Sequence, residues 1–216
     1  GRDCYDIVVE RGILDKAKEH FIEFNAEISG REISEMYYTT EINGYTFIVL
    51  GSETDRTAAY FSPEQLEWLD AEMAEAAKDD KPIFVISHWP INQSHGLPET
   101  WGDKEPEPDD GGIGDESDAV NEILKKYENV FMISGHLHNG IGDAATESIW
   151  SYTSVESEGS FHSINLPAYM YFNARGQVLN GNGFNFEVYD DEVIIRARSY
   201  TSDIWYTSYE YVIPLV

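Results

Sequence analysis

The chain of 216 residues has a single cysteine, Cys4, so no disulfide can form within it. No apolar run approaches the roughly 20 residues needed to cross a bilayer, and no charged segment followed by an apolar one has the pattern of a secretory leader. We therefore expect a soluble chain held together by its core. The lack of a disulfide leaves the compartment open, because secreted bacterial proteins need not contain disulfides. We favour a secreted or cell-surface bacterial location slightly over the cytoplasm.

Basic residues are also scarce, at 14 Lys and Arg against 40 Asp and Glu, which gives a formal net charge of -26. This charge repels nucleic-acid backbones and anionic membranes at long range, so neither is expected as a partner. The simplest interpretation is a soluble acidic surface, because net charge bears on solubility and association rather than on fold. The length suffices for one sizeable core.

Two apolar, strand-like runs end in histidine. Val130–Ser134 leads through a glycine into His136 and His138, and Pro82–Ser87 leads into His88. Alternate side chains of an extended segment point the same way, so His136 and His138 can lean toward one point. If the two strands are parallel neighbours, their carboxyl ends bring His88 to the same place, where open α/β sheets bind ligands. The sequence therefore predicts a metal site with three imidazole ligands.

The order of these features resembles that of a known family. A helix start at Phe61-Ser62-Pro63 precedes the strand that ends in His88-Trp89-Pro90, and the next strand ends in Gly135-His136-Leu137-His138. Over about residues 37 to 140 this pattern is similar to the carboxyl-terminal half of the calcineurin-like metallophosphoesterases, which include the purple acid phosphatases. The resemblance implies an α/β (α+β) fold. It would be part of a four-layer αββα sandwich, with a mixed sheet, flanking helices and an antiparallel, β-rich carboxyl-terminal portion.

The resemblance also implies a chemistry. Members of the family use two metal ions to hold a phosphate mono- or diester and to promote its hydrolysis. Carried over by motif, His88 and His136 would bind one metal ion and His138 the other. Imidazole ligands suit zinc, iron or manganese, and three imidazoles alone could hold a single zinc ion.

A long loop over residues 91–116 follows the first histidine. Loops of this length are usually functional or mobile. In the family this loop would form a wall over the metal centre, so the resemblance implies Asn92, His95 and Trp101 as candidates for contact with substrate. The alternative, to which we give equal weight, is a disordered acidic loop that does not contact substrate.

Three motifs of the family are absent in their expected order. Asp-x-His does not occur, every Gly-Asp pair follows His88, and Gly181-Asn182-Gly183 lacks the histidine of Gly-Asn-His. The resemblance thus implies the carboxyl-terminal portion of a phosphoesterase, with no catalytic residue of its own, little activity alone and an exposed sheet face that favours self-association. The competing hypothesis is a non-catalytic, β-rich binding or structural domain that keeps the fold.

Local patterns predict most of the remaining elements. Asn43-Gly44 between residues 37–42 and 45–50 predicts a hairpin with a type I′ turn, and Ser62 with Gln65 predicts a capping box at a helix start. Further helices are expected over residues 10–25 and 118–127 from their apolar spacing. His20 is expected as a helix residue without a ligand role.

Beyond residue 148 the chain turns to short β-favouring runs without helix signals. His162 is expected there as a sheet residue with a hydrogen bond. The sequence therefore predicts one partial domain over residues 1–216, with an α/β part over 1–147 and a β-rich continuation over 148–216. We expect this continuation to complete the sheet and to add a small antiparallel edge. The expected strands cover residues 149–155, 161–166, 168–173, 184–190, 192–200 and 208–214.

Overall fold

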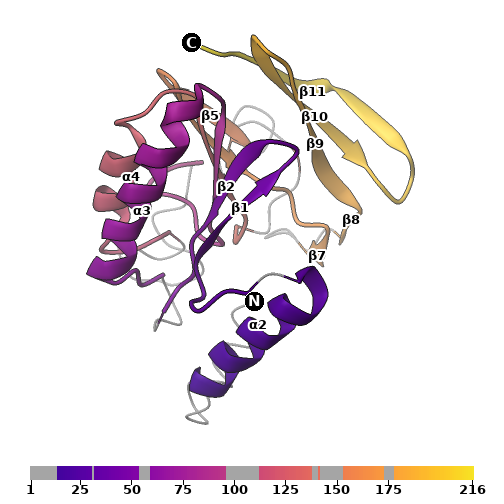
Figure 1. The fold of residues 1–216 in the computed structure, drawn as a ribbon. Helices are drawn as coiled ribbons and strands as arrows, with labels where there is room; N and C mark the ends of the chain where they lie inside the picture. The colour runs from indigo at the N-terminus through magenta and orange to yellow at the C-terminus, as the bar shows by residue number, and fades with distance from the viewer. Residues whose placement is uncertain are drawn as a thin grey trace.

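Three layers of secondary structure form the molecule (Figure 1). Helices α3 (Pro63–Ala76) and α4 (Ser117–Leu124) cover one face of a six-stranded sheet, and a three-stranded sheet covers the other face. The predicted mixed α/β class is confirmed, and these are three of the layers of the predicted sandwich. The computed structural model describes residues 14–30, 32–53, 59–95, 112–137, 141, 153–172 and 178–216.

The six-stranded sheet mixes parallel and antiparallel strands in the order β1-β2-β3-β4-β6-β5. Its four central strands run parallel, and the two edge strands pair antiparallel with their neighbours. The central strands are β2 (Tyr45–Val49), β3 (Ile83–Ile86), β4 (Val130–Ser134) and β6 (Phe161–Asn165), and the edges are β1 (Tyr38–Ile42) and β5 (Val155–Glu158).

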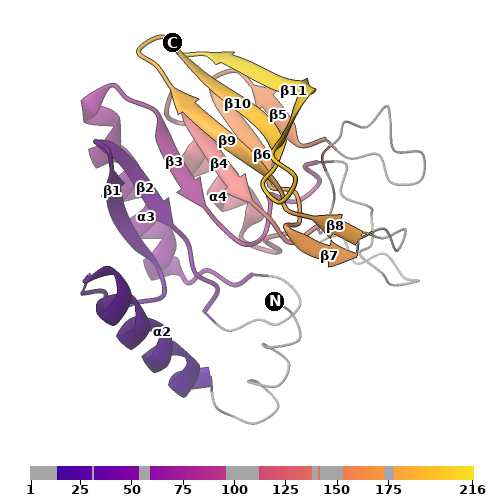
Figure 2. The same cartoon turned by 90° about the vertical axis from the view of Figure 1, so that its right-hand side faces the viewer.

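The second sheet is wholly antiparallel, in the order β11-β10-β9, and Figure 2 shows it lying across the face of the first. It consists of β9 (Asn182–Val188), β10 (Glu192–Ser199) and β11 (Ile204–Pro214), and a small pair, β7 (Met170–Phe172) with β8 (Val178–Asn180), precedes it. Strands β5 and β6 complete the first sheet. β6 lies within the predicted strand 161–166, whereas β5 begins only at Val155, the last residue of the predicted strand 149–155. The later strands form a sheet of their own instead of an added edge, and the division into one domain stays a prediction.

Strand β4 separates two apolar cores because its side chains alternate between the two faces of the sheet. Val130 and Met132 pack with the buried faces of α3 and α4. Phe131 and Ile133 pack with residues of the second sheet. All residues of β4 are buried, as expected for a central parallel strand that is covered on both faces.

The predicted hairpin is confirmed. β1 pairs with β2 in register from Tyr38 opposite Val49 to Ile42 opposite Tyr45. The two turn residues, Asn43 and Gly44, have φ values of 54° and 81°. Positive φ at both central positions is the requirement of a type I′ turn, which is why the Asn-Gly pair identified it.

The start of α3 is capped in a slightly different way from the one predicted. Ser62 Oγ accepts a hydrogen bond from Gln65 N at 3.2 Å, as expected. The Ser62 N–H, however, donates to a Glu53 carboxylate oxygen at 2.6 Å and not to the Gln65 side chain. The fully buried Gln65 amide instead bonds both backbone groups of Gly51. The hydrogen bonds at the start of α3 therefore also hold the chain that leaves β2. A short 3₁₀ turn, η1 (Ala77–Asp79), follows the end of α3.

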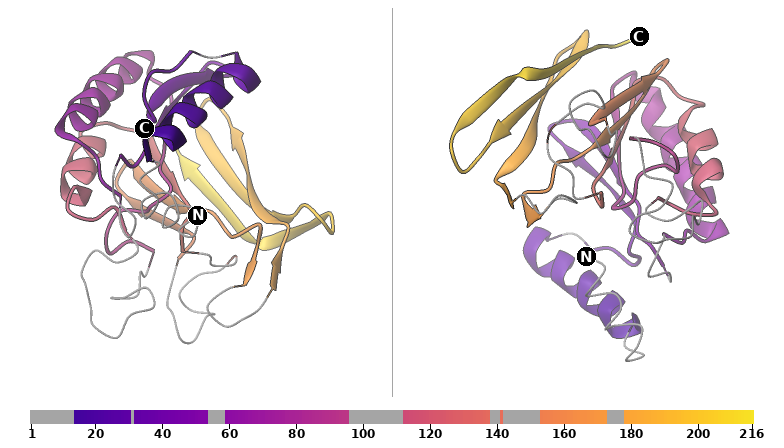
Figure 3. Two further views of the ribbon diagram at one scale, coloured as in Figure 1. Left: turned by 90° about the horizontal axis from the view of Figure 1, so that it is seen from below. Right: turned by 180° about the vertical axis from the view of Figure 1, so that it is seen from behind.

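Helix α2 (Leu14–Ser29) ends four residues later than the sequence pattern predicted, and residues 10–13 lie outside the described residues. Asn25 does not end the helix, which continues to Ser29. Its side-chain amide donates to Phe21 O at 2.9 Å. Gly30, at a φ of 66°, ends the helix. Figure 3 shows α2 apart from α3 and α4. Among the described residues, no helix is long and apolar enough to cross a membrane.

Candidate metal centre

The candidate centre lies where β3 and β4 end. These strands are adjacent and parallel, as predicted, and His88 and His136 follow their last residues. Backbone hydrogen bonds continue the pairing past the strands. Ser87 N donates to Ile133 O at 3.0 Å, and Gly135 N donates to His88 O at 3.1 Å. The two turns are therefore fixed to each other, so the sheet register determines the distance between the histidines.

The two imidazole rings face each other. His136 Nδ1 lies 3.1 Å from His88 Nε2, and the ring planes are inclined by 79°. His88 is exposed and His136 is half-buried, so the pair is open to solvent on one side. The structure thus brings together two of the three predicted ligands, while His138 lies outside the described residues.

The turn that carries His136 has an unusual backbone. His136 has a φ of 66°, a left-handed conformation that non-glycine residues adopt only when their surroundings hold them in it. Asn165, at the end of β6, supplies such a restraint. Its side-chain amide donates to Gly135 O and, at 3.3 Å, to Ser134 Oγ, and Leu166 N donates to Ser134 O at 2.7 Å. Strand β6 therefore holds the turn in place.

The indole of Trp89 forms an apolar wall beside both rings. Its centroid is 4.8 Å from the His88 ring and 5.7 Å from the His136 ring. Trp89 is 9% exposed, and its Nε1 has no hydrogen-bond partner within the described part of the chain. A buried apolar surface at this position limits water on one side of the imidazoles and strengthens electrostatic interactions there.

The two nitrogens fit the geometry of a shared metal ion. The 3.1 Å between His88 Nε2 and His136 Nδ1 is the length of a hydrogen bond between the two rings. It is also compatible with two ligands of one ion, which lie ~3.0–3.4 Å apart when metal–nitrogen bonds are about 2.0–2.1 Å. Imidazole suits zinc and iron as a ligand. Among the described residues, however, no group of three His, Cys, Asp or Glu side chains could hold a metal. The described part of the site therefore supplies two donors, and the role of these residues as ligands stays a prediction.

His95, a predicted substrate contact, is fully buried and makes hydrogen bonds inside the chain. Its Nδ1 donates to Thr153 O at 2.7 Å, so Nε2 accepts from Ser163 Oγ at 2.8 Å. Burial lowers the pKa of His95 below its ordinary value, although Glu156 and the Thr153 carbonyl oppose this shift. Both ring nitrogens are thus engaged, and a neutral His95 fixes the chain after β3 to strand β6.

Asn92, the second predicted substrate contact, joins the two ends of the long loop. Its side-chain amide donates to Gly114 O at 2.9 Å and accepts from Gly114 N at 3.0 Å. Its backbone N–H donates to Ser117 Oγ at 2.8 Å, at the start of α4. These bonds are a structural use of the side chain, and a role toward substrate stays a prediction. The third candidate, Trp101, lies outside the described residues.

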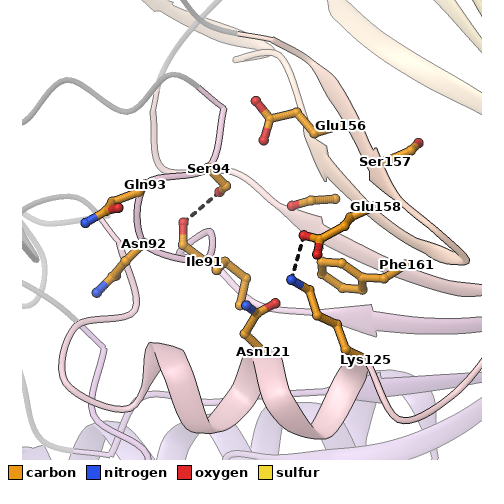
Figure 4. Close-up of a pocket in the computed structure, with 11 residues that line it drawn as sticks. Ile91, Asn92, Gln93, Ser94, Asn121, Lys125, Glu156, Ser157, Glu158 and Phe161 are labelled. Carbon is orange, nitrogen blue, oxygen red and sulfur yellow. Dashed lines mark hydrogen bonds and ion pairs between the residues drawn. The ribbon is translucent and has the colours of Figure 1, made fainter.

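A cavity of about 340 Å³ lies between this loop, α4 and the edge strand β5 (Figure 4). Lys125 Nζ bonds Glu158 Oε2 across it at 2.6 Å. Asn92 and Ser163, the partner of His95, belong to its lining, whereas His88 and His136 do not. Asn92 therefore lines a cavity to which the histidine pair does not belong.

Sequence reasoning missed Asn165, although a signal was present. Asn165 is the last residue of β6, a buried strand next to β4, so the position of polar residues at strand ends is the signal that points to it. His162 was interpreted correctly. It is buried in β6, its Nδ1 bonds Ser157 Oγ at 2.9 Å, and burial lowers its pKa.

Comparison with known proteins gives structural neighbours only. A dimetal phosphatase from Danio rerio is similar with a TM-score of 0.49 and 17% identity, over 73% of this chain and 40% of that one. A purple acid phosphatase from yellow lupin (Lupinus luteus) seeds is similar with a TM-score of 0.48 and 13% identity, over 82% of this chain and 32% of that one. The chain thus spans less than half the length of either protein. No protein-family model matches it, and no curated protein matches it in sequence.

Proposed function

We propose that the chain carries part of the site of a metal-dependent phosphoesterase, a hydrolase of phosphate mono- or diesters. The observation that carries this proposal is the pair of facing imidazole nitrogens, 3.1 Å apart, at the ends of two adjacent parallel strands. The carboxyl ends of parallel strands are where open α/β sheets bind ligands. The order of the His-Trp-Pro and Gly-His-Leu-His segments supports the same assignment.

The division of roles follows the motifs. His88 and His136 would hold one metal ion, and His138 would bind the second ion of the intact site. When bound, such ions act as Lewis acids toward a phosphoryl group and promote attack by water. Zinc, iron and manganese are the candidates, because imidazole nitrogens suit zinc and iron, and the carboxylates that would complete the centre suit manganese.

The chain's own residues would orient the ligands and shield them. Asn165 would position His136 through its bond to Gly135 O, and Trp89 would keep water from one side of the ring pair. We also propose that the 216 residues are one partial domain and that further ligands complete the centre, because the sequence lacks three motifs of the resembled family. Turnover by this chain alone should accordingly be slight, since groups that act as a unit fail together.

Phosphate binding tests the proposal without requiring turnover. Inorganic phosphate is titrated with the purified chain and Mn²⁺, and ³¹P line broadening reports phosphate held near the ion. We expect broadening that is reversed by a chelator and lost in His88→Gln. His20→Gln, a change at an exposed histidine of α2, is the matched control and should behave as the parent chain does. Equal broadening in His88→Gln and His20→Gln would contradict the proposal.

A further inference from the structure

The ladder between β10 and β11 contains a large irregularity. Arg196 pairs with Glu210 and Arg198 pairs with Trp205, so Ala197 of β10 lies opposite the stretch from Tyr206 to Tyr209 of β11. The ladder pairs none of these four residues with β10. Bulges of this kind re-aim side chains and are frequent beside binding sites. Here the irregularity opens a cavity of about 270 Å³ in the second sheet, lined by Arg196, Ala197, Trp205, Tyr206, Thr207 and Glu210.

Arg196, Trp205 and Glu210 line the cavity from the outer face of the second sheet, whereas Ala197 and Tyr206 line it from the core between the sheets. Along β10, Ile195 and Ala197 are buried against the first sheet, and Arg196 and Arg198 alternate with them. Trp205 is the cross-strand partner of Arg198 and therefore shares its face. Figure 1 shows β10 and β11 on the outside of the molecule, across from α3 and α4. The cavity is thus separate from the histidine pair.

Charged groups of the wall are held in pairs. Arg196 Nε lies 2.8 Å from Glu210 Oε2, an ion-pair contact that is not aligned as a hydrogen bond. Arg196 Nη1 donates to Glu187 Oε1 at 3.3 Å. These contacts hold the guanidinium and the carboxylates in fixed positions, so that donors and acceptors lie next to each other along one edge of the cavity.

The lining also contains an aromatic side chain, Trp205. Trp205 is 43% exposed, although large aromatic side chains are usually buried. The guanidinium of Arg198 lies 4.5 Å from the centroid of the Trp205 ring and fixes the indole by a cation–π contact. A rigid, partly exposed indole beside an ion-paired guanidinium and carboxylate combines an apolar platform with fixed polar groups, the usual composition of a small-molecule site.

We propose that this cavity binds a neutral saccharide. The C–H face of a sugar ring can pack on the Trp205 indole, while adjacent hydroxyls donate to the Glu210 carboxylate and accept from the Arg196 guanidinium and the Thr207 hydroxyl. An anion is disfavoured by Glu210 and Glu187 and by the net charge of -26. The cavity falls below the range of about 300–1,000 Å³ of drug-sized sites, so a single sugar ring is the expected occupant.

Nuclear magnetic resonance on the ¹⁵N-labelled chain tests this proposal. Glucose, galactose, mannose and N-acetylglucosamine are titrated in turn, and the indole N–H signals are followed together with the backbone amide signals of residues 196–210, which remain in every variant. At least one sugar should shift the Trp205 signal in a saturable way, with a Kd of about 1 mM for so small a ligand. Trp205→Ala and Glu210→Gln should weaken binding about tenfold or more, and Tyr169→Ala, at an exposed tyrosine outside this sheet, should leave it unchanged.

Two outcomes would overturn the proposal. One is the absence of a saturable shift with all four sugars, and the other is equal binding by Glu210→Gln and Tyr169→Ala. Glu210→Gln keeps the side-chain shape and so guards against a folding defect in Trp205→Ala. Binding should persist with a chelator and in His88→Gln, which distinguishes a sugar site on β10 and β11 from any effect of the metal centre.

Discussion

The two candidate sites of this chain are made in different ways. In the first sheet, His88 and His136 meet because two parallel strands end at the same level, and the backbone bonds past Ile86 and Ser134 keep them together. In the second sheet, Trp205 and Glu210 come from one strand and surround a cavity only because that strand departs from regular pairing. Parallel strands thus gather residues from distant parts of the sequence, whereas an antiparallel sheet needs an irregularity to form a hollow.

The largest expected effect is on stability, and it comes from disrupting the core between the two sheets. Phe131 is fully buried in the core between the sheets, with its ring centroid 5.4 Å from Phe84 and 4.9 Å from His162. Phe131→Ala should lower the free energy of unfolding by about 3–5 kcal/mol, because it leaves a cavity that the sheets cannot close. Urea unfolding measures this. Val212→Ala, at a 52% exposed position of β11, is the control and should change stability by no more than about 0.5 kcal/mol.

A smaller effect is expected at Asn165. It should show whether this residue positions the His136 ligand or only stabilises the fold. Asn165→Ala removes the amide that bonds Gly135 O and Ser134 Oγ. The loss should cost about 1–3 kcal/mol of stability, because buried polar groups lose their partner. It should also weaken Zn²⁺ binding about tenfold, as changes to residues that orient a ligand do. If calorimetry finds the stability loss without any change in Zn²⁺ affinity, Asn165 has a structural role only.

His95, which joins the chain after β3 to strand β6, should make the stability of the folded chain sensitive to acid. Burial lowers the pKa of His95 in the folded chain, so below its ordinary value of 6.5 the unfolded chain binds a proton that the folded chain does not. Stability is therefore complete above 6.5 and falls as the pH drops below it, by at most about 1.4 kcal/mol per pH unit for one proton.

Urea unfolding at a series of pH values checks this sign. His95→Gln removes the titrating group and should flatten the slope relative to the parent chain. His20→Gln, at an exposed position, should keep the parent's slope. An unchanged slope in His95→Gln would mean that other groups set the acid sensitivity.

Elements that are determined by neighbouring residues could be predicted from the sequence. Asn43-Gly44 identified the first hairpin because only residues tolerant of positive φ fit its turn. Ser62 and Pro63 located the start of α3 for a similar reason. The adjacency of β3 and β4 also followed from the pattern, since apolar strands separated by a helix form parallel neighbours.

Features that depend on distant partners could not be predicted. His95 bonds residues 58 and 68 positions away, so nothing near it in the sequence indicates that both its nitrogens are used. The cavity at Ala197 arises from a shift in strand register, which local composition does not encode. The helix predicted over residues 10–25 continues to Ser29, and Gly30 ends it.

The central claim is that His88 and His136 bind the same metal ion. Calorimetric titration with Zn²⁺ of the parent chain, His88→Gln, His136→Gln and the double variant tests it most directly. We expect each single change to weaken Zn²⁺ binding about tenfold or more, and the double change to cost little more than either one, because ligands of one ion are not independent. His20→Gln should bind as the parent does. Equal Zn²⁺ affinity in the parent and in both single variants would contradict the account.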